Sequence, residues 1–431
     1  MIALRLALAH LLVLAAGDAL AVRAGVRPRA ARFAVAVALG ALATSAVMFF
    51  ESLVFQGGVS AFTVALPLLL LALLRPRPTL RPRLPGMLAI VLALPLLGLA
   101  VANTTTTLAT PLQGDAASVW EIKAGIAFEA RGVPATYFED DSRAFSHREY
   151  PWLVPLDECW LYLATGVRDE EVAKSFFPIV FAALLAGFLG AAERRLERPW
   201  AVLATVALGT VPALFHAAAS GYADVPLALF SMLAAIHAAE WLASGRTRDA
   251  LLAAALGVGA AWTKREGVVA LGLVASTFMG GRLAGRSALE WRRALLALVA
   301  LALPLLGTWQ LLLAKHHVHA EDFGALHPGR LVPIAKLVLA DLFFPDQIPK
   351  VWGIVWLALG ASLVLRPWTR ERTTFVAFAL VPLAVLPLAY AFSTWPSWQA
   401  HVGTSLNRIL LPQVPAALLA VIAAARAPRS G

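Results

Sequence analysis

Long apolar runs are the sequence feature that most limits what this chain can fold into. Many runs of about 14 to 22 residues, nearly free of charged side chains, recur along the 431 positions. A bilayer core of about 30 Å is spanned by roughly 20 helical residues, so such runs predict transmembrane helices. Only 14% of the residues are charged, whereas a soluble domain has about a quarter charged. The sequence therefore predicts an all-α polytopic membrane protein and excludes a soluble globular enzyme.

The positive charge is concentrated in short loops between the apolar runs. Of the 36 Lys and Arg residues, 22 lie in seven such loops. Basic loops beside membrane helices mark the cytoplasmic side. The net charge of +10 therefore reports topology, and no nucleic-acid partner is expected. The loops are 23–32, 75–83, 193–198, 244–249, 282–293, 366–372 and 426–431.

Placing these loops in the cytoplasm predicts about 13 transmembrane helices, with the N-terminus outside and the C-terminus inside. We expect an N-terminal extension of three helices over 1–83, a catalytic core over 84–425 and a cytoplasmic tail over 426–431. The predicted helices are 2–22, 33–55, 59–74, 84–103, 172–192, 199–218, 225–243, 250–262, 267–281, 294–313, 351–365, 374–392 and 409–425.

Three segments remain on the outer side: 104–171, 314–350 and 393–408. The first carries 12 of the 26 acidic residues and is far longer than an ordinary connection, which is typical of a functional loop. Within it, residues 115–130 predict an amphipathic helix on the membrane surface. The two short apolar pieces at 250–262 and 267–281 should meet near the outer interface, because neither is long enough to cross fully.

Two carboxylates at the outer ends of predicted helices are candidate catalytic residues. Asp115 follows the fourth predicted helix, and Asp224 precedes the seventh. Each also has a purely structural interpretation as a helix N-cap, and Pro226 suits the first turn after Asp224. Spacing alone leaves both interpretations open. The two carboxylates could also share a divalent metal ion, so the need for a metal cofactor stays open as well.

Cationic side chains on the same side are candidates for binding a lipid phosphate headgroup. Lys264 and Arg265 lie at the apex between the two short pieces, and Arg408 precedes the last predicted helix. His147 and Arg148 lie in the long outer segment and could hold a phosphate or a sugar acid. Basic side chains that only snorkel from helix ends are the structural alternative for each residue.

Taken in order, several short motifs resemble the GT-C superfamily of integral membrane glycosyltransferases. The similarity is to the bacterial enzymes related to protein O-mannosyltransferases and to the lipid A aminoarabinose transferase, and it covers roughly 84–425. The motifs are Gly114-Asp115-Ala116 with Trp120 and Lys123, His147 with Tyr150-Pro151-Trp152-Leu153-Val154-Pro155, Gly221-Tyr222-Ala223-Asp224-Val225-Pro226-Leu227, Ala261-Trp262-Thr263-Lys264-Arg265-Glu266-Gly267, and His401 with Thr404-Ser405-Leu406-Asn407-Arg408.

The resemblance implies an enzyme that moves a sugar from a polyprenyl-phosphate donor to an acceptor hydroxyl, with inversion. It implies a site on the outer face of a bacterial inner membrane and a glycolipid, a cell-envelope glycan or a protein as acceptor, with membrane lipids around it. The essential carboxylate of the family falls on Asp115 and the second on Asp224. The expected substrate-binding residues are Lys123, His147, Arg148, Tyr150, Lys264, Arg265, Glu266 and Arg408.

One family feature differs in this chain. Such enzymes often carry Lys-Pro-Pro in the first outer loop, whereas this sequence has Arg148-Glu149-Tyr150-Pro151. The phosphate-binding role of that lysine would therefore pass to His147 or Arg148. The chemistry is consistent with the residues, since a phosphate leaving group needs cations and an attacking hydroxyl needs a base.

Two other functions compete with this interpretation. A transporter or flippase of lipid-linked sugars would need ionisable residues near the middle of several helices, but the charge is concentrated outside them. A ligase or polymerase of surface polysaccharide would also use lipid-linked sugars. Proteins of that kind usually carry their large outer loop late in the chain, and here it comes early.

Overall fold

The fold was analysed in a computed structural model that describes residues 1–27, 29–75, 87–319, 323–344, 346, 348–365 and 368–425. These residues are mostly helical, and extended pairing among them is limited to an isolated bridge between Phe323 and Ser393. Within the described ranges, eight helical runs are long and apolar enough to cross a bilayer. The prediction of an all-α, multi-pass membrane protein is confirmed at this level.

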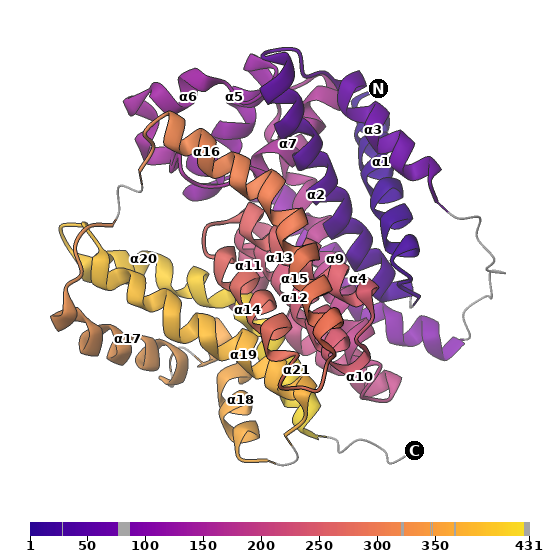
Figure 1. The fold of residues 1–431 in the computed structure, drawn as a ribbon, viewed down its shortest axis with the longest axis vertical. Helices are drawn as coiled ribbons and strands as arrows, with labels where there is room; N and C mark the ends of the chain where they lie inside the picture. The colour runs from indigo at the N-terminus through magenta and orange to yellow at the C-terminus, as the bar shows by residue number, and fades with distance from the viewer. Residues whose placement is uncertain are drawn as a thin grey trace.

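The first part of the chain forms the N-terminal helices and the first outer segment (Figure 1). The elements are α1 (Ile2–Arg23), α2 (Arg29–Phe55), α3 (Ala61–Leu73), α4 (Met87–Ala109), the π-helix η1 (Ala116–Glu121), α5 (Ile122–Ala130), α6 (Ala135–Glu139), the 3₁₀-helix η2 (Asp141–Ser146), α7 (Leu153–Thr165) and α8 (Glu170–Lys174).

The remaining helices run from the middle of the bundle to its C-terminal flank. They are α9 (Phe176–Ala192), α10 (Arg198–Gly209), α11 (Pro212–Ala219), α12 (Asp224–Ser244), α13 (Thr247–Thr263), α14 (Gly267–Gly280), α15 (Ala288–Ala302), η3 (Leu303–Gly307), α16 (Thr308–Lys315), η4 (Pro328–Arg330), α17 (Leu331–Phe343), η5 (Ile348–Trp352), α18 (Val355–Leu363), α19 (Arg370–Val385), η6 (Leu386–Phe392), α20 (Trp398–Leu410), η7 (Leu411–Gln413) and α21 (Val414–Ala425).

Small residues let neighbouring helices approach closely, which is how helices pack where lipid removes the hydrophobic driving force. A Cβ atom added at Gly17 of α1 would lie 1.8 Å from the carbonyl oxygen of Ala36 in α2. One added at Gly40 of α2 would lie 2.4 Å from the carbonyl oxygen of Val13. The α1–α2 pair therefore depends on glycine at both positions. The most buried spanning helix is α12, which lies in the centre of the bundle.

The arginine-rich loops that are described meet at one end of the bundle. The Arg23 side chain donates to the carbonyl oxygen of Leu74 at 2.8 Å, and Gly25 lies against the guanidinium of Arg248. Arg194 forms an ion pair with Glu240, and Arg195 forms one with Glu371. A Cβ at Gly245 would contact the side chains of Arg286 and Glu290.

The first outer segment lies at the opposite end of the molecule. In Figure 1, α5 and α6 lie near the top, and α10 and α21 lie near the bottom. Arg5, in the first turns of α1, donates to the carbonyl oxygen of Thr165 at the end of α7 at 3.2 Å. The N-terminal end of α1 is therefore at the same end as this segment. The described basic loops and the first outer segment therefore lie at opposite ends of the bundle.

Several predicted boundaries differ from the structure. The predicted helix at 199–218 is broken into α10 and α11, which meet at an angle of 66° where Pro212 begins the second piece. The stretch 393–408, predicted as an outer connection, contains α20, which continues through η7 into α21 as a run from Trp398 to Ala425. This helix was not predicted, because the search was for long apolar runs and α20 carries many polar side chains. Only one face of α20 is apolar.

The predicted amphipathic helix at 115–130 is also corrected in part. The helix exists as η1 followed by α5, but it packs against α7 and is not exposed along one whole face. Its acidic side chains are held by Arg168, which donates to Glu121 at 3.1 Å and to Glu129 at 2.6 Å. Lys123 is fully buried between this helix and its neighbours. The helix is therefore buried against its neighbours and does not lie on the surface.

Candidate functional site

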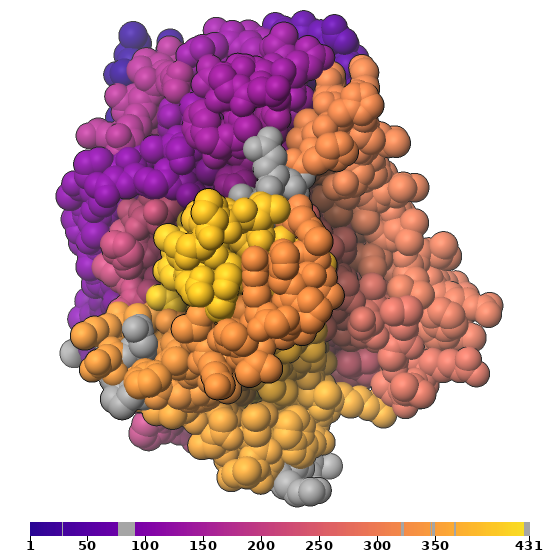
Figure 2. All heavy atoms as spheres, turned by 90° about the vertical axis from the view of Figure 1, so that its left-hand side faces the viewer, coloured from indigo at the N-terminus to yellow at the C-terminus, as the bar shows by residue number. Residues whose placement is uncertain are grey.

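A cavity of about 830 Å³ opens between the first outer segment and α20. In Figure 2, α20 (yellow) lies in the middle of this face, with α17 (orange) beside it and the first outer segment (purple) above. The cavity is lined by Asp115, which precedes η1, and by residues of the turn between α13 and α14, of η6 and of α20. Its lining residues are Asp115, His147, Tyr150, Tyr222, Lys264, Arg265, Glu266, Val269, Phe323, Val385, Leu386, Leu388, Ala389, Tyr390, Phe392, Trp395, His401, Thr404, Ser405, Arg408 and Ile409.

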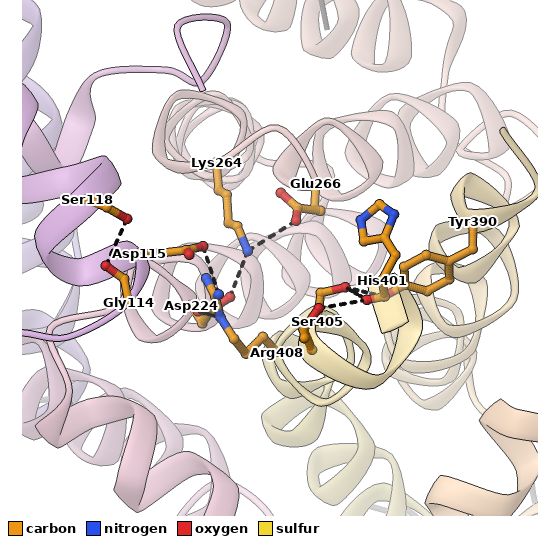
Figure 3. Close-up of polar contacts among 11 residues, drawn as sticks. Gly114, Asp115, Ser118, Asp224, Lys264, Glu266, Tyr390, His401, Ser405 and Arg408 are labelled. Carbon is orange, nitrogen blue, oxygen red and sulfur yellow. Dashed lines mark hydrogen bonds and ion pairs between the residues drawn. The ribbon is translucent and has the colours of Figure 1, made fainter. Parts of the chain in front are cut away.

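Arg408 connects the two candidate catalytic carboxylates (Figure 3). Its Nη1 donates to Asp115 Oδ2 at 2.8 Å, and its Nε donates to Asp224 Oδ2 at 3.2 Å. The guanidinium also lies 4.3 Å from the centre of the Tyr222 ring, in a cation–π contact. A rigid planar fork can satisfy two carboxylates at once, which a lysine ammonium does less well. The sequence had suggested a shared metal ion as the link between Asp115 and Asp224, but it had not placed Arg408 between them.

A second cation fixes Asp224 from the other side. Lys264 Nζ donates to Asp224 Oδ1 at 2.9 Å and lies 3.1 Å from Glu266 Oε1. Asp224 is completely buried and Lys264 is 4% exposed, so both charges depend on these contacts. A Cβ at Gly267 would lie 1.9 Å from the carbonyl oxygen of Ala260, so only glycine allows the tight turn that carries Lys264.

The structure decides against the N-cap interpretation of both carboxylates. Asp115 precedes η1 but makes no side-chain capping hydrogen bond, and Ala223 precedes α12 while Asp224 is already in its first turn. The preceding Gly114 has φ of +53°, and a Cβ there would lie 2.8 Å from the Tyr222 hydroxyl. Both carboxylates are therefore directed into the charged cluster and away from their own helix ends.

The environments of the two carboxylates differ, which suggests different tasks. The Asp115 side chain is 35% exposed and has Arg408 as its ion-pair partner, whereas Asp224 is fully buried between Arg408 and Lys264. A substrate in the cavity can reach Asp115 but is screened from Asp224. Asp115 is therefore suited to direct chemistry, and Asp224 to positioning the two cations.

Other polar groups of the cavity are available to a ligand. The exposed Arg265 has its guanidinium 5.0 Å from the centre of the Phe323 ring, and it has no carboxylate partner within the described residues. Glu266 Oε2 is buried and has no hydrogen-bond partner among the residues that the structure describes. An uncompensated cation and a free acceptor so close together can bind an anion and a hydroxyl, respectively.

An aromatic wall closes the side of the cavity opposite Asp115. The rings of Trp395 and His401 are stacked with centres 4.5 Å apart, and Tyr390 packs edge-on against His401. Two hydroxyl contacts fix this wall: the Tyr390 hydroxyl lies 2.8 Å from Ser405 Oγ, and His401 Nδ1 lies 2.8 Å from Ser393 Oγ. These residues were not predicted as site residues, although His401 and Ser405 belong to the same motif as Arg408.

The predicted residues of the first outer segment divide into two groups. His147 and Tyr150 line the cavity, with their rings stacked 4.7 Å apart. Lys123 and Arg148 are not among the lining residues. Arg148 donates to the carbonyl oxygen of Phe138 at 2.9 Å, and Lys123 donates to that of His147 at 2.7 Å. Both therefore hold the loop that carries His147, whose φ is +52°.

Lys123 is an unusual support for this loop because it is buried among aromatic rings. Its Nζ lies between 5.6 and 5.9 Å from the ring centres of Trp120, Tyr150 and Trp152. Burial lowers the pKa of Lys123 to about 7, and the negative charge of Glu149 partly opposes this shift. Its amine is therefore much less basic than that of an exposed lysine.

The residues of the site do not fit a divalent metal ion shared by Asp115 and Asp224. The position between the two carboxylates is taken by the guanidinium of Arg408, and Lys264 holds the other oxygen of Asp224. A divalent cation there would have to displace both positive groups. The metal hypothesis for these two residues is therefore disfavoured by the donor set itself.

Fold and site together define a multi-pass helical membrane protein with a charged, aromatic-walled cavity at one end of the bundle. In comparisons with known proteins, no family model, no curated protein and no solved structure matches the chain.

Proposed function

We propose that the protein is a glycosyltransferase that moves a sugar from a polyprenyl-phosphate donor to an acceptor hydroxyl. The observation that carries the proposal is the partly exposed Asp115 carboxylate, held by Arg408 at a large cavity that also contains the uncompensated cation Arg265. Such a reaction needs a base for the attacking hydroxyl and a cation for the leaving phosphate, and the cavity offers a candidate for each.

In this proposal Asp115 is the general base. It takes the proton of the acceptor hydroxyl while that oxygen forms a bond to the anomeric carbon of the sugar. The bond between the anomeric carbon and the phosphate oxygen breaks, and the polyprenyl phosphate leaves with the electron pair. Attack from the side opposite the leaving group inverts the anomeric centre.

Arg265 is the proposed partner of the donor phosphate, with His147 as a second polar group on the cavity wall. Arg408 and Lys264 also line the cavity, but their charges are largely balanced by Asp115, Asp224 and Glu266. Arg148 points its guanidinium at a backbone carbonyl. Arg265 is therefore a better candidate for binding the donor phosphate than Arg408, Lys264 or Arg148.

The aromatic and apolar walls of the cavity suit the sugar ring and the isoprene chain of the donor. The stacked Trp395 and His401 rings offer a flat apolar surface of the kind that sugar rings pack against. Apolar side chains of η6 and the end of α19 continue the cavity wall and suit the first isoprene units of the lipid; they are Val385, Leu386, Leu388 and Ala389. The apolar and polar parts are thus arranged for a lipid-linked, hydroxylated substrate.

The proposal extends to topology. We place the arginine-rich end in the cytoplasm and the cavity on the outer face of a bacterial inner membrane, following the rule that basic loops stay inside. About 13 passes and a GT-C-like core over 84–425 are part of the same proposal. The acceptor is a glycolipid, a cell-envelope glycan or a protein.

The test is transfer in proteoliposomes from a panel of radiolabelled polyprenyl-phosphate sugars, with wild type and Asp115→Asn side by side. Label that reaches an acceptor or water from one donor with wild type, and not with the variant, supports the proposal. Undiminished transfer by Asp115→Asn would contradict the role of this carboxylate. Labelled lipid that crosses the bilayer without being consumed would instead indicate a flippase.

A further inference from the structure

A second cavity, of about 340 Å³, lies at the arginine-rich end of the bundle. It is formed by the turn between α1 and α2, the end of α9, the last turns of α12 and the first turn of α13. Asp224 and Glu240 are at opposite ends of α12, about 24 Å apart at a rise of 1.5 Å per residue. The second cavity is therefore separate from the candidate active site and close to the other membrane surface.

The charges around this cavity are predominantly positive. Four arginines line it, together with Glu240, Asp249 and the imidazole of His237; the arginines are Arg27, Arg194, Arg246 and Arg248. Arg194 is paired with Glu240, and Arg248 lies 3.6 Å from Asp249, which also accepts a hydrogen bond from Ser244 at 2.5 Å. Two carboxylates thus face four guanidinium groups, and two positive charges are left over.

The remaining charge is carried mainly by Arg27 and Arg246. Arg27 is exposed and has no hydrogen-bond or ion-pair partner within the described residues. Arg246 is 59% exposed and only reaches Asp249 at 4.0 Å, the longest of the contacts to that carboxylate. The two guanidinium groups come from different turns but line the same cavity. They can therefore bind one anion from two sides.

A cation is the alternative occupant, and the charges argue against it. His237, Glu240 and Asp249 could present three ligand atoms within 4.8 Å of one another. His237 Nδ1 is already 2.8 Å from Glu240 Oε2, and each carboxylate is engaged by arginine. A divalent ion would break these contacts and would be repelled by the four neighbouring guanidinium groups.

We propose that this cavity binds the anionic phosphate headgroup of a phospholipid, with Arg27 and Arg246 as the principal ligands. Basic pockets between transmembrane helices, at the membrane surface, are suited to anionic headgroups because guanidinium groups form charge-assisted hydrogen bonds with phosphate. The apolar residues Ala24, Val26 and Leu252 on the same wall suit the glycerol and the start of the acyl chains. A soluble phosphate ester offers the same chemistry, and the test separates the two sources.

The experiment measures lipid binding by the full-length, delipidated protein in detergent with native mass spectrometry. The probes are phosphatidylglycerol, phosphatidylcholine with the same acyl chains, and glycerol 3-phosphate. The test variant is Arg27→Gln/Arg246→Gln, which leaves the Arg194–Glu240 and Arg248–Asp249 pairs intact. The matched control is Arg282→Gln/Arg293→Gln, which removes two exposed arginines of the neighbouring basic loop.

We expect wild type to bind phosphatidylglycerol at least tenfold more tightly than phosphatidylcholine. The test variant should lose about 25-fold in phosphatidylglycerol affinity, which is about fivefold per arginine charge at a membrane surface. The control should bind as wild type does, and Arg27→Lys/Arg246→Lys should restore most of the affinity because it keeps both charges. All four proteins should share one elution volume and one melting temperature within a few degrees.

Equal binding of phosphatidylglycerol by wild type and the test variant would overturn the proposal. So would equal binding of the two lipids by wild type. Glycerol 3-phosphate that binds as tightly as phosphatidylglycerol, and depends on the same two arginines, would support the anion site and overturn the lipid as its source. None of these results depends on sugar transfer, so they test the second cavity alone.

Discussion

Arg408 and Asp115 form an ion pair of 2.8 Å although 293 positions separate them in the chain. Arg408 belongs to α20 and Asp115 directly precedes η1, so the pair joins the last spanning run of the described chain to the segment that follows α4. The same guanidinium holds Asp224 at the start of α12. One arginine therefore brings together three parts of the chain at the cavity and leaves Asp115 accessible.

Replacing Asp115 by Asn should remove catalysis without unfolding the protein. The side chain is partly exposed and Asn keeps its shape, so the melting temperature in detergent should change little. Loss of a general base lowers rates by roughly a hundred- to ten-thousandfold. The measurement is the initial rate of sugar transfer in proteoliposomes.

Asp18→Asn is the matched control for this variant. Asp18 pairs with Arg32 and Arg75 at the arginine-rich end, away from the cavity that contains Asp115. Its transfer rate should remain within about twofold of wild type. A comparable loss of activity in both variants would mean that the effect of Asp115→Asn is not local to the site.

Asp224→Asn should destabilise the fold as well as impair transfer. The carboxylate is fully buried between Lys264 and Arg408, and its removal leaves a buried ammonium with Glu266 as its remaining ion-pair partner. Breaking a buried ion pair costs about 3–5 kcal/mol. We expect a clear fall in the melting temperature in detergent.

The double variant Asp224→Asn/Lys264→Met separates the ion pair from other effects. Removing both partners avoids a stranded charge, so the double variant should be more stable than Asp224→Asn alone. If instead the loss of stability in the double variant equals the sum of the losses in Asp224→Asn and Lys264→Met, the two residues are not energetically coupled. The ion pair between them would then not be what stabilises the cluster.

Lys123 should make stability depend on pH. Its pKa is about 7 in the folded protein and near 10.5 when unfolded, so the unfolded chain binds more protons between these values. The cost of burying Lys123 is therefore greatest below pH 7 and is relieved as the pH rises toward 10.5. Wild-type stability relative to Lys123→Met should increase by about 1.4 kcal/mol per pH unit in this window. Thermal unfolding of both proteins at pH 6.5, 7.5, 8.5 and 9.5 measures it, and a flat difference would rule out a lowered pKa.

Gly267→Ala should disturb the turn that positions Lys264. The added methyl group would lie 1.9 Å from the carbonyl oxygen of Ala260, which is backbone and cannot move aside cheaply. We expect a loss of about 1–3 kcal/mol and weaker sugar transfer. Gly272→Ala in the same helix is the control, because nothing lies within 4 Å of its added Cβ and alanine favours helices. The melting temperatures should therefore move in opposite directions, and a shared fall would contradict the close-contact explanation.

Part of the site could be predicted from the sequence because helix ends and charge sidedness are local properties. Counting charged loops predicted that Asp115, Asp224, Lys264 and Arg408 lie on the same side of the membrane, and the structure brings all four together in one cluster. Their ion-pair partners could not be predicted. A carboxylate at a helix end can either cap the helix or pair with a distant cation, and its position in the sequence is the same in both cases. The aromatic wall was missed because Tyr390 and Trp395 belong to none of the motifs, and His401, which does belong to one, was given no role of its own.

By itself, the sequence determined that the chain is an all-helical membrane protein and which helix ends carry charge. Apolar run length and the cost of burying charge in lipid act through neighbouring residues, so both can be read without knowing the fold. Tertiary structure alone decided which charges meet. It joined Arg408 to Asp115 and withdrew Lys123 and Arg148 from the cavity to support the loop of His147. Ion pairs between distant segments depend on how helices pack, and packing is settled by contacts such as Gly17 against Ala36 that no local pattern specifies.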